Sequence, residues 1–182
     1  MTKTCCKTSV GVLIFSADRT ELLMIERGTL PAGIAPVAGH GDLTTEHPTF
    51  EAAARAEVRE EVGLEVTGLT RLPVGGYHPG RCRRPGSTGH KWEVFEATVT
   101  GELAASEREV RRAGWWSLGD LQHLAERTAD HAAGLITADD FALTPGLEPV
   151  WCHWLHELGY IDLPAVDLDA IEALAATPQG DR

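Results

Sequence analysis

The feature that most constrains the fold is an alanine-rich helix pattern over residues 48–62, which lies between segments with strand character. Thr45 or Thr49 can cap its start, and Gly63 is well placed to end it. Apolar strand patterns surround this helix at residues 8–16, 21–26, 64–77, 91–100 and 110–117. One long helix between strands favours an α/β or α+β sandwich with a mixed sheet over a doubly wound parallel sheet.

The connections between these segments contain turn and loop signals. The turn Asp18-Arg19-Thr20 joins the first two strand patterns and predicts an opening β-hairpin. Residues 28–38 contain two prolines and two glycines and predict a loop that continues to residue 47. Residues 78–90 form a second Gly/Pro-rich loop.

The C-terminal part of the chain has helical patterns. A helix capped by Ser117 is expected to run towards residue 133, and amphipathic patterns follow at residues 149–158 and 167–176. We expect residues 1–143 to form one domain, with residues 144–182 as a helical extension packed on it and a frayed tail. Trp151 and Trp154, at i and i+3, dock this extension on the sandwich or on a second subunit, which would give a homodimer.

Composition excludes several classes of protein. The 182 residues carry a formal net charge of −11, so a general nucleic-acid binder with a basic stripe is not expected. A membrane helix needs about 20 apolar residues, and the longest apolar run here is far shorter. The N-terminal residues have no secretion-signal pattern. The four cysteines form no C-x-x-C pair, which favours free thiols in the cytoplasm.

Three carboxylates share one face of the central helix. Glu57, Glu60 and Glu61 stand at i, i+3 and i+4, which is one side of an α-helix. Like charges at this spacing repel one another, so their placement does not stabilise the helix. The pattern fits either a solvated surface or a site for a hard cation such as Mg²⁺, which prefers oxygen ligands.

The surrounding sequence distinguishes these alternatives. Residues 39–64 read GHGDLTTEHPTFEAAARAEVREEVGL. This segment resembles the signature of the Nudix hydrolases, G-x5-E-x7-R-E-U-x-E-E-x-G-U, where U is aliphatic. Glu57 and Val58 match the E-U step, Glu60 and Glu61 the E-E pair, and the last glycine and aliphatic residue also match. The resemblance implies the family's α/β/α sandwich over residues 7–133.

Two positions depart from the family signature. Ala56 stands where the family has an arginine that orients a catalytic glutamate. Arg55 points about 100° away from position 56 around the helix. The loop between Asp42 and the helix also carries three extra residues, and Glu46 is the candidate for the family's first glutamate.

The resemblance assigns further residues to the site. In the family, a loop glutamate lies six residues before a tryptophan, and Glu109 and Trp115 have this spacing. Glu109 is therefore a candidate metal ligand or base. The family also uses the backbone carbonyl before the first glycine of the signature, which is that of Ala38 here. Gly39 is assigned to substrate binding.

The implied activity is hydrolysis of a diphosphate linked to another group, with Mg²⁺ or Mn²⁺ held by Glu57, Glu60, Glu61, Ala38 and Glu109. Glu57 or Glu109 would act as the general base. The substrate is a nucleoside triphosphate, a nucleotide sugar, a dinucleotide or a prenyl diphosphate.

Arginines of the second loop are candidates for phosphate binding, because guanidinium groups match phosphate oxygens. They are Arg81, Arg83 and Arg84. The other interpretation of this segment is a solvated loop. His78, Cys82 and His90 match no standard zinc-finger spacing, so the sequence does not predict a zinc site there.

Two other functions fit the same fold. One is a nucleotide-binding sensor without hydrolysis, which the loss of the family arginine at Ala56 would favour. The other is an isopentenyl diphosphate isomerase, disfavoured because Cys5 and Cys6 lie far upstream of the loop that carries the catalytic cysteine in that enzyme.

Overall fold

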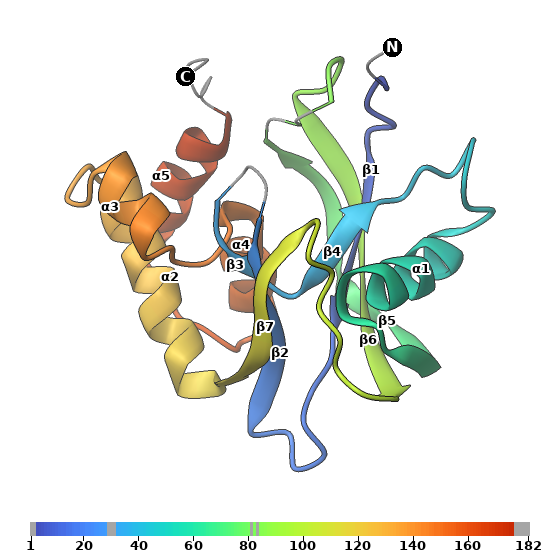
Figure 1. Cartoon of the computed structure of the whole chain (residues 1–182). Coiled ribbons are helices and arrows are strands. Elements are labelled where there is room, and N and C mark those ends of the chain that lie inside the picture. Colours follow the sequence, from blue (N-terminus) through green and yellow to red (C-terminus); the bar gives the residue numbers. More distant parts are fainter. Residues whose placement is uncertain (1–2, 29–31, 81, 83, 177–182) are drawn as a thin grey trace.

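Two sheets lie side by side in the middle of the molecule, and helices cover both outer faces (Figure 1). The computed structural model describes residues 3–28, 32–80, 82 and 84–176. The strands are β1 (Thr8–Leu13), β2 (Glu21–Arg27), β3 (Ile34–Ala35), β4 (Val37–His40), β5 (Glu65–Pro79), β6 (Gly89–Thr100) and β7 (Val110–Ser117). The helices are α1 (Phe50–Val62), α2 (Leu118–Ala132), α3 (Ala138–Leu143), α4 (Pro149–Glu157) and α5 (Ala165–Ala176).

The first sheet has the strand order β4-β1-β6-β5 and the second β3-β2-β7. Strand β1 pairs parallel with β6 and antiparallel with β4, so the first sheet is mixed. One core lies between the sheets and α1, and the other between the sheets and α2, α4 and α5. This layering confirms the predicted α/β/α sandwich with a mixed sheet (Figure 1).

Helix α1 forms as its sequence predicts. The Thr49 hydroxyl oxygen accepts a hydrogen bond from the Ala52 N–H at 3.2 Å, which caps the first turn. Gly63 has a φ of 71° and donates its N–H to the Arg59 carbonyl, which ends the helix. Ala53, Val58 and Glu61 are buried, whereas Glu60 is exposed.

The predicted opening hairpin forms only next to its turn. Phe15 and Leu22 make an antiparallel bridge, and the Ser16 N–H donates to the Glu21 carbonyl at 3.0 Å. Beyond this bridge, β1 and β2 belong to different sheets. Both strands are buried along most of their length. Each therefore pairs with further strands inside its own sheet instead of lying at a solvent-exposed edge. The loop predicted for residues 28–47 contains β3 and β4, which Pro36 separates into the two sheets.

The C-terminal helices pack on the sandwich of their own chain. Trp151 is fully buried, and a Cβ on Gly11 of β1 would lie 2.4 Å from its ring. Trp154 is also buried in the same core. Helix α3 was not predicted. The predicted frayed tail, residues 177–182, lies outside the described residues.

None of the helices in the described part of the chain has the length and hydrophobicity of a membrane span.

Candidate active site

Glu61 and β4 form the most buried part of the site. Glu61 is 5% exposed, and its Oε2 accepts a hydrogen bond from the Ala38 N–H at 3.1 Å. Burial raises the pKa of Glu61 to about 8, and the nearby charge of Glu57 adds to this effect. Arg27 and the Ala38 hydrogen bond oppose the rise but do not cancel it. Without a further cation, much of this carboxyl is therefore protonated at neutral pH.

Glu57 lies against the next residue of β4. A Cβ on Gly39 would stand 1.9 Å from the Glu57 Oε1 atom, so only glycine allows this close approach. Burial raises the pKa of Glu57 to about 7, with the charges of Glu60 and Glu109 as further causes. The glycine of the signature thus makes room for the carboxylate of the helix.

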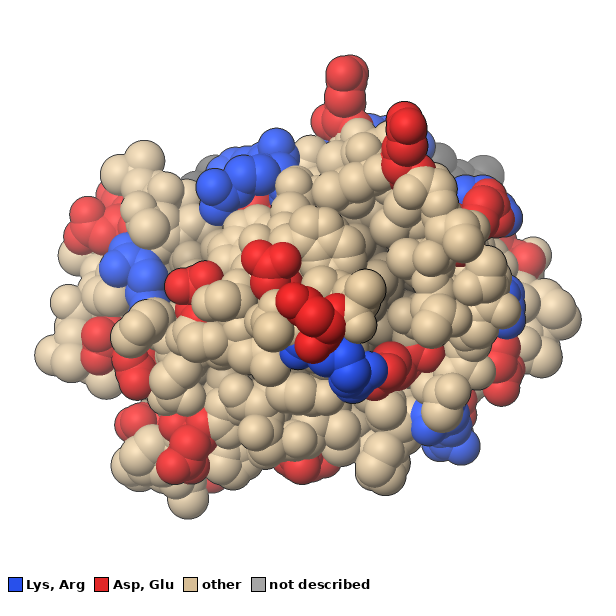
Figure 2. Space-filling view, turned by 90° about the horizontal axis from the view of Figure 1, so that it is seen from below, with Lys and Arg blue, Asp and Glu red and all other residues tan. Residues whose placement is uncertain are grey.

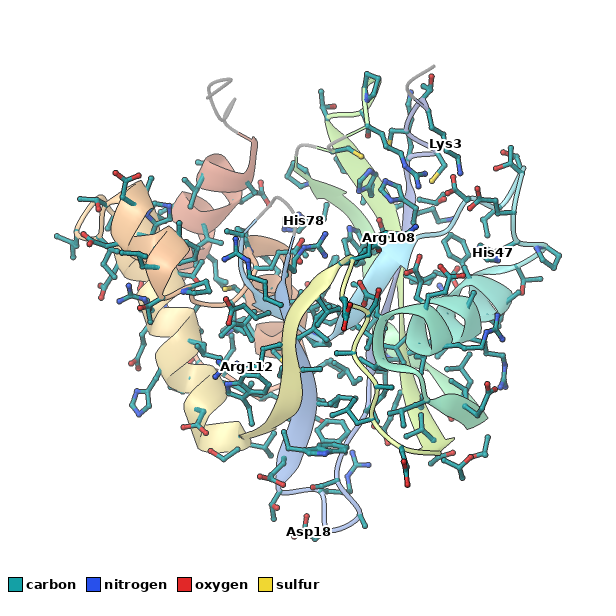
Figure 3. The ribbon with its side chains drawn as sticks, viewed as in Figure 1. Lys3, Asp18, His47, His78, Arg108 and Arg112 are labelled. Atoms are coloured by element: carbon teal, nitrogen blue, oxygen red, sulfur yellow. The ribbon has the colours of Figure 1, made fainter. Side chains whose placement is uncertain are left out.

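Glu60 and Glu109 complete what we call the acidic cluster, which consists of Glu57, Glu60, Glu61 and Glu109. Glu60 is exposed on α1, and Glu109 precedes β7. The Glu109 carbonyl accepts a hydrogen bond from the Gly28 N–H at 2.8 Å, which ties this loop to the end of β2. Arg108, labelled in Figure 3, pairs with the Glu109 carboxylate at 2.8 Å.

Arg27 is the residue that the sequence interpretation missed. It ends β2, and its Nη1 lies 3.3 Å from Glu148 Oε2, at the start of α4. The charges of Glu148, Glu61, Glu57 and Glu109 hold its pKa above the ordinary value, with Glu148 as the strongest cause. The available signal was an arginine at the end of a buried strand, in ELLMIER, which is an unusual place for an unpaired charge.

The position that holds an arginine in the family signature is occupied here by a buried alanine. Ala56 is 6% exposed and packs in the core under α1. Arg55 turns the other way and donates a hydrogen bond from Nη1 to the Val66 carbonyl at 2.7 Å. The guanidinium near Glu57 and Glu61 therefore comes from Arg27 on β2 and not from the helix.

The arginine-containing loop is partly engaged elsewhere. Arg84 Nη1 donates to Asp42 Oδ2 at 2.7 Å, and Lys3 Nζ donates to the same oxygen at 2.9 Å. Glu46, the candidate first glutamate of the signature, is ion-paired with Lys3. Arg81 and Arg83 lie outside the described residues.

The three residues weighed as zinc ligands are not one group. Cys82 and His90 lie with Cys5 and His40, whereas His78 lies with His153 and Glu172. The thiol of Cys5 therefore belongs to this group of cysteines and histidines and not to the acidic cluster.

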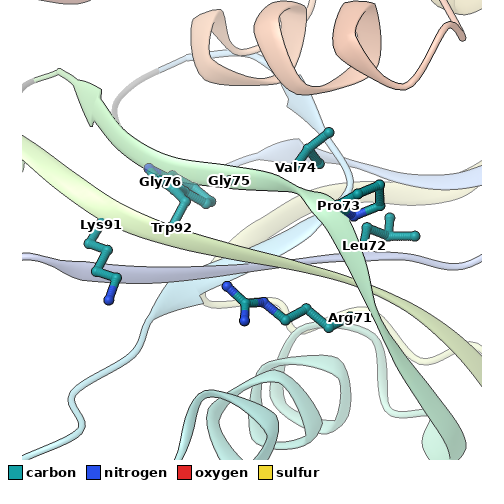
Figure 4. A pocket seen from close by; sticks show the side chains of 8 residues that line it. All are labelled: Arg71, Leu72, Pro73, Val74, Gly75, Gly76, Lys91 and Trp92. Atoms are coloured by element: carbon teal, nitrogen blue, oxygen red, sulfur yellow. The ribbon is translucent and has the colours of Figure 1, made fainter.

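A hollow of about 450 Å³ lies over β5 and β6 (Figure 4). Its lining consists of Arg71, Leu72, Pro73, Val74, Gly75, Gly76, Lys91 and Trp92. No carboxylate of the acidic cluster lines it.

The space-filling view from below shows acidic side chains spread over the face that it presents, with basic ones between them, in keeping with the net charge of −11 (Figure 2).

A comparison of the sequence with models of known protein families identifies the class of protein to which this fold and the acidic cluster belong. The family model of the NUDIX domain matches residues 7–138, which is most of the chain. The chain therefore belongs to the NUDIX family. A search among curated proteins finds no match.

Solved structures share the fold at low sequence identity. The NUDIX domain of Shewanella oneidensis NrtR, complexed with ADP ribose, is 16% identical with a TM-score of 0.53, over 68% of this chain and 79% of that one. A MutT protein from Methanosarcina mazei Go1 is 18% identical with a TM-score of 0.50, over 68% and 85%. At these identities the likeness shows the fold alone.

Proposed function

We propose that the protein is a Mg²⁺-dependent hydrolase, also served by Mn²⁺, that cleaves a nucleoside diphosphate linked to another moiety. The observation that carries this proposal is the pair of carboxylates of half-buried Glu57 and buried Glu61, held against the backbone of Ala38 and Gly39. Burying two acidic groups side by side is unfavourable for a fold unless a cation compensates them.

The donor set fits Mg²⁺. Carboxylate oxygens of the acidic cluster and the Ala38 carbonyl are hard oxygen donors, which this ion prefers. Arg27 and, more weakly, Arg84 offset only part of the charge, because the pKa of Glu57 stays raised. When bound, Mg²⁺ supplies positive charge to phosphate oxygens and makes water a better nucleophile.

The chain's own residues position the reaction. Glu57, Glu60 and Glu61 hold the ion on the rigid face of α1, with Glu109 as a further ligand. The proton of the attacking water goes to a carboxylate oxygen of Glu57 or of Glu109. Comparing the pH profiles of kcat for Glu57→Gln and Glu109→Gln separates the two, since the loss of the base removes the acidic limb of the profile.

The substrate class is a nucleotide derivative. The NUDIX domain of NrtR was solved with ADP ribose, which supports a ligand containing a nucleoside diphosphate. Gly39 brings the backbone of β4 close to the carboxylates, and we assign it to substrate binding with Arg81, Arg83 and Arg84. Because Arg84 already donates to Asp42, it would contact phosphate with its remaining N–H groups.

A phosphate-release screen over nucleoside triphosphates, nucleotide sugars, dinucleotides and prenyl diphosphates tests the proposal, with Mg²⁺ and with EDTA. We expect hydrolysis of at least one nucleotide derivative with Mg²⁺ and none with EDTA. Tight binding of a nucleotide with no turnover would instead establish the sensor function. Isomerisation of isopentenyl diphosphate, followed by mass spectrometry of the product, would overturn the hydrolase.

We also propose a cytoplasmic location, supported by four cysteines that form no disulfide.

A further inference from the structure

A second group of metal-binding side chains lies outside the acidic cluster. We call it the Cys/His cluster; its members are Cys5, His40, Cys82 and His90. Each offers one ligand atom, and these four atoms all lie within 4.8 Å of one another. The Cys5 sulfur is 2.9 Å from His90 Nε2, and the Cys82 sulfur is 3.2 Å from His40 Nε2.

The number and type of donors are those of a structural zinc site. Two cysteine sulfurs and two histidine nitrogens form a tetrahedral set for Zn²⁺, with bonds of about 2.3 Å to sulfur and about 2.0–2.1 Å to nitrogen. Donors in such a tetrahedron are separated by about 3.3–3.8 Å. The observed distances of 2.9 and 3.2 Å and the limit of 4.8 Å bracket this range, so small side-chain shifts produce the geometry.

The backbone is arranged to support sulfur as a negatively charged ligand. The Lys7 N–H donates to the Cys5 sulfur at 3.3 Å, and the Arg84 N–H donates to the Cys82 sulfur at 3.2 Å. In both cases the donor is two residues after the cysteine. Hydrogen bonds of this kind stabilise a thiolate and orient it for a metal ion.

We propose that the Cys/His cluster binds one Zn²⁺ ion. All four positions of the tetrahedron are filled by the protein, which makes the site closed and structural, since a catalytic zinc keeps one position for water or substrate. Two thiolates balance the charge of the ion, so the closed site is neutral.

The site would tie together segments that meet beside the acidic cluster. Cys5 precedes β1, His40 ends β4, Cys82 lies between β5 and β6, and His90 is in β6. The nearby ion pairs of Asp42 with Lys3, labelled in Figure 3, and with Arg84 join the same segments. By binding His40, the zinc would fix the end of β4. Gly39, the residue before His40, lies against Glu57.

A second group of side chains could also bind zinc and so contribute to the zinc content that is measured. His78, His153 and Glu172 also place their donor atoms within 4.8 Å of one another. Their set holds three donors, and Glu172 is exposed. Variants in each group must therefore be compared.

The test is the zinc content of the full chain, purified under reducing conditions after zinc supplementation and gel filtration. We expect about one Zn²⁺ per chain, because four donors complete one tetrahedral ion. The double variant Cys5→Ser/Cys82→Ser should lose this zinc. Cys6→Ser is the matched control, since its sulfur donates to the Thr8 carbonyl outside the cluster, and it should retain the ion.

Cobalt substitution keeps the proposal testable if the double variant does not fold. Wild-type protein loaded with Co²⁺ should show the visible absorption of a tetrahedral ion with a sulfur-to-cobalt charge-transfer band, and His90→Gln should change it. The proposal is overturned by zinc-free wild type, by a Cys5–Cys82 disulfide in its intact mass, by unchanged zinc in the double variant, or by zinc lost only in His153→Ala.

Discussion

Strand β4 borders two clusters of opposite character. Ala38 and Gly39 face the acidic cluster, which is rich in oxygen donors, and His40 belongs to the Cys/His cluster, which offers sulfur and nitrogen. In the first cluster the carboxyls of Glu57 and Glu61 have raised pKa values. In the second, the donors already hydrogen-bond to one another.

Under the two proposals, the contrast separates a reactive site from a structural one. Uncompensated buried charge is unfavourable for the fold and persists where function requires it. A set of donors that satisfy one another adds order without storing such charge. We therefore expect changes in the acidic cluster to alter catalysis and pH dependence, and changes in the Cys/His cluster to alter metal content and local order.

The largest expected effect comes from removing the guanidinium of Arg27, which lies beside the acidic cluster and pairs with buried Glu148. Arg27→Gln leaves Glu148 as an unpaired buried carboxylate, which should lower the free energy of unfolding by about 3–5 kcal/mol. Urea denaturation measures the loss. Arg111→Gln is the control, because its side chain is 60% exposed and 3.8 Å from its partner, and it should cost less than about 1 kcal/mol.

Adding Glu148→Gln to Arg27→Gln should recover part of the stability, because no buried carboxylate is then left alone. Equal losses for Arg27→Gln and Arg111→Gln would contradict a buried ion pair at the site.

The next effect distinguishes the two clusters by activity. Glu61→Gln should lower kcat by about 10²–10³, the range seen when one charge-stabilising group is removed from an active site. Its zinc content should match the wild type. Glu51→Gln, on the exposed first turn of the same helix, is the matched control and should retain its rate. Full activity in Glu61→Gln would sink the metal-site assignment while leaving the family membership intact.

Local sequence signals predicted much of this fold. The bounds of α1 follow from Thr49 and Gly63, and β7 and α2 follow from an apolar run before Ser117. The pairing of strands could not be predicted the same way, because it depends on contacts between distant segments. The opening hairpin illustrates this limit: its two segments pair beside the turn, but β1 and β2 then pair with strands from distant parts of the chain.

The geometry of the proposed site was predictable only in part. The spacing of Glu57, Glu60 and Glu61 placed them on one face, and α1 has them there. Arg27 could not be assigned, because β2 reaches the carboxylates only through sheet packing. The Cys/His cluster was equally hidden, since its members are spread over residues 5–90 and His78, predicted in the same loop as Cys82, lies in β5 with a different group.

A smaller effect concerns pH in the metal-free protein. Glu57 and Glu61 have folded pKa values of about 7 and about 8, above the ordinary 4.5, so the native state binds more protons than the unfolded chain. Stability should therefore be highest near pH 5 and fall as the pH rises to 8, by at most about 1.4 kcal/mol per pH unit for one proton. Thermal melts at constant ionic strength measure this slope, and Glu61→Gln should flatten it. A stability that rises over this range would contradict the buried pair.

The smallest effect isolates charge repulsion from packing. Glu60 is exposed and lies beside Glu57 on α1, so Glu60→Gln removes a like charge without opening a cavity. The metal-free protein should become more stable by about 0.2–0.5 kcal/mol, the range for a like-charge pair on one helix face.

Excess Mg²⁺ should then stabilise the wild type more than the variant, because the variant has lost a ligand. Paired melts with EDTA and with Mg²⁺ give both numbers. A solvated acidic face predicts identical Mg²⁺ shifts for the two proteins, and that result would remove Glu60 from the proposed metal site.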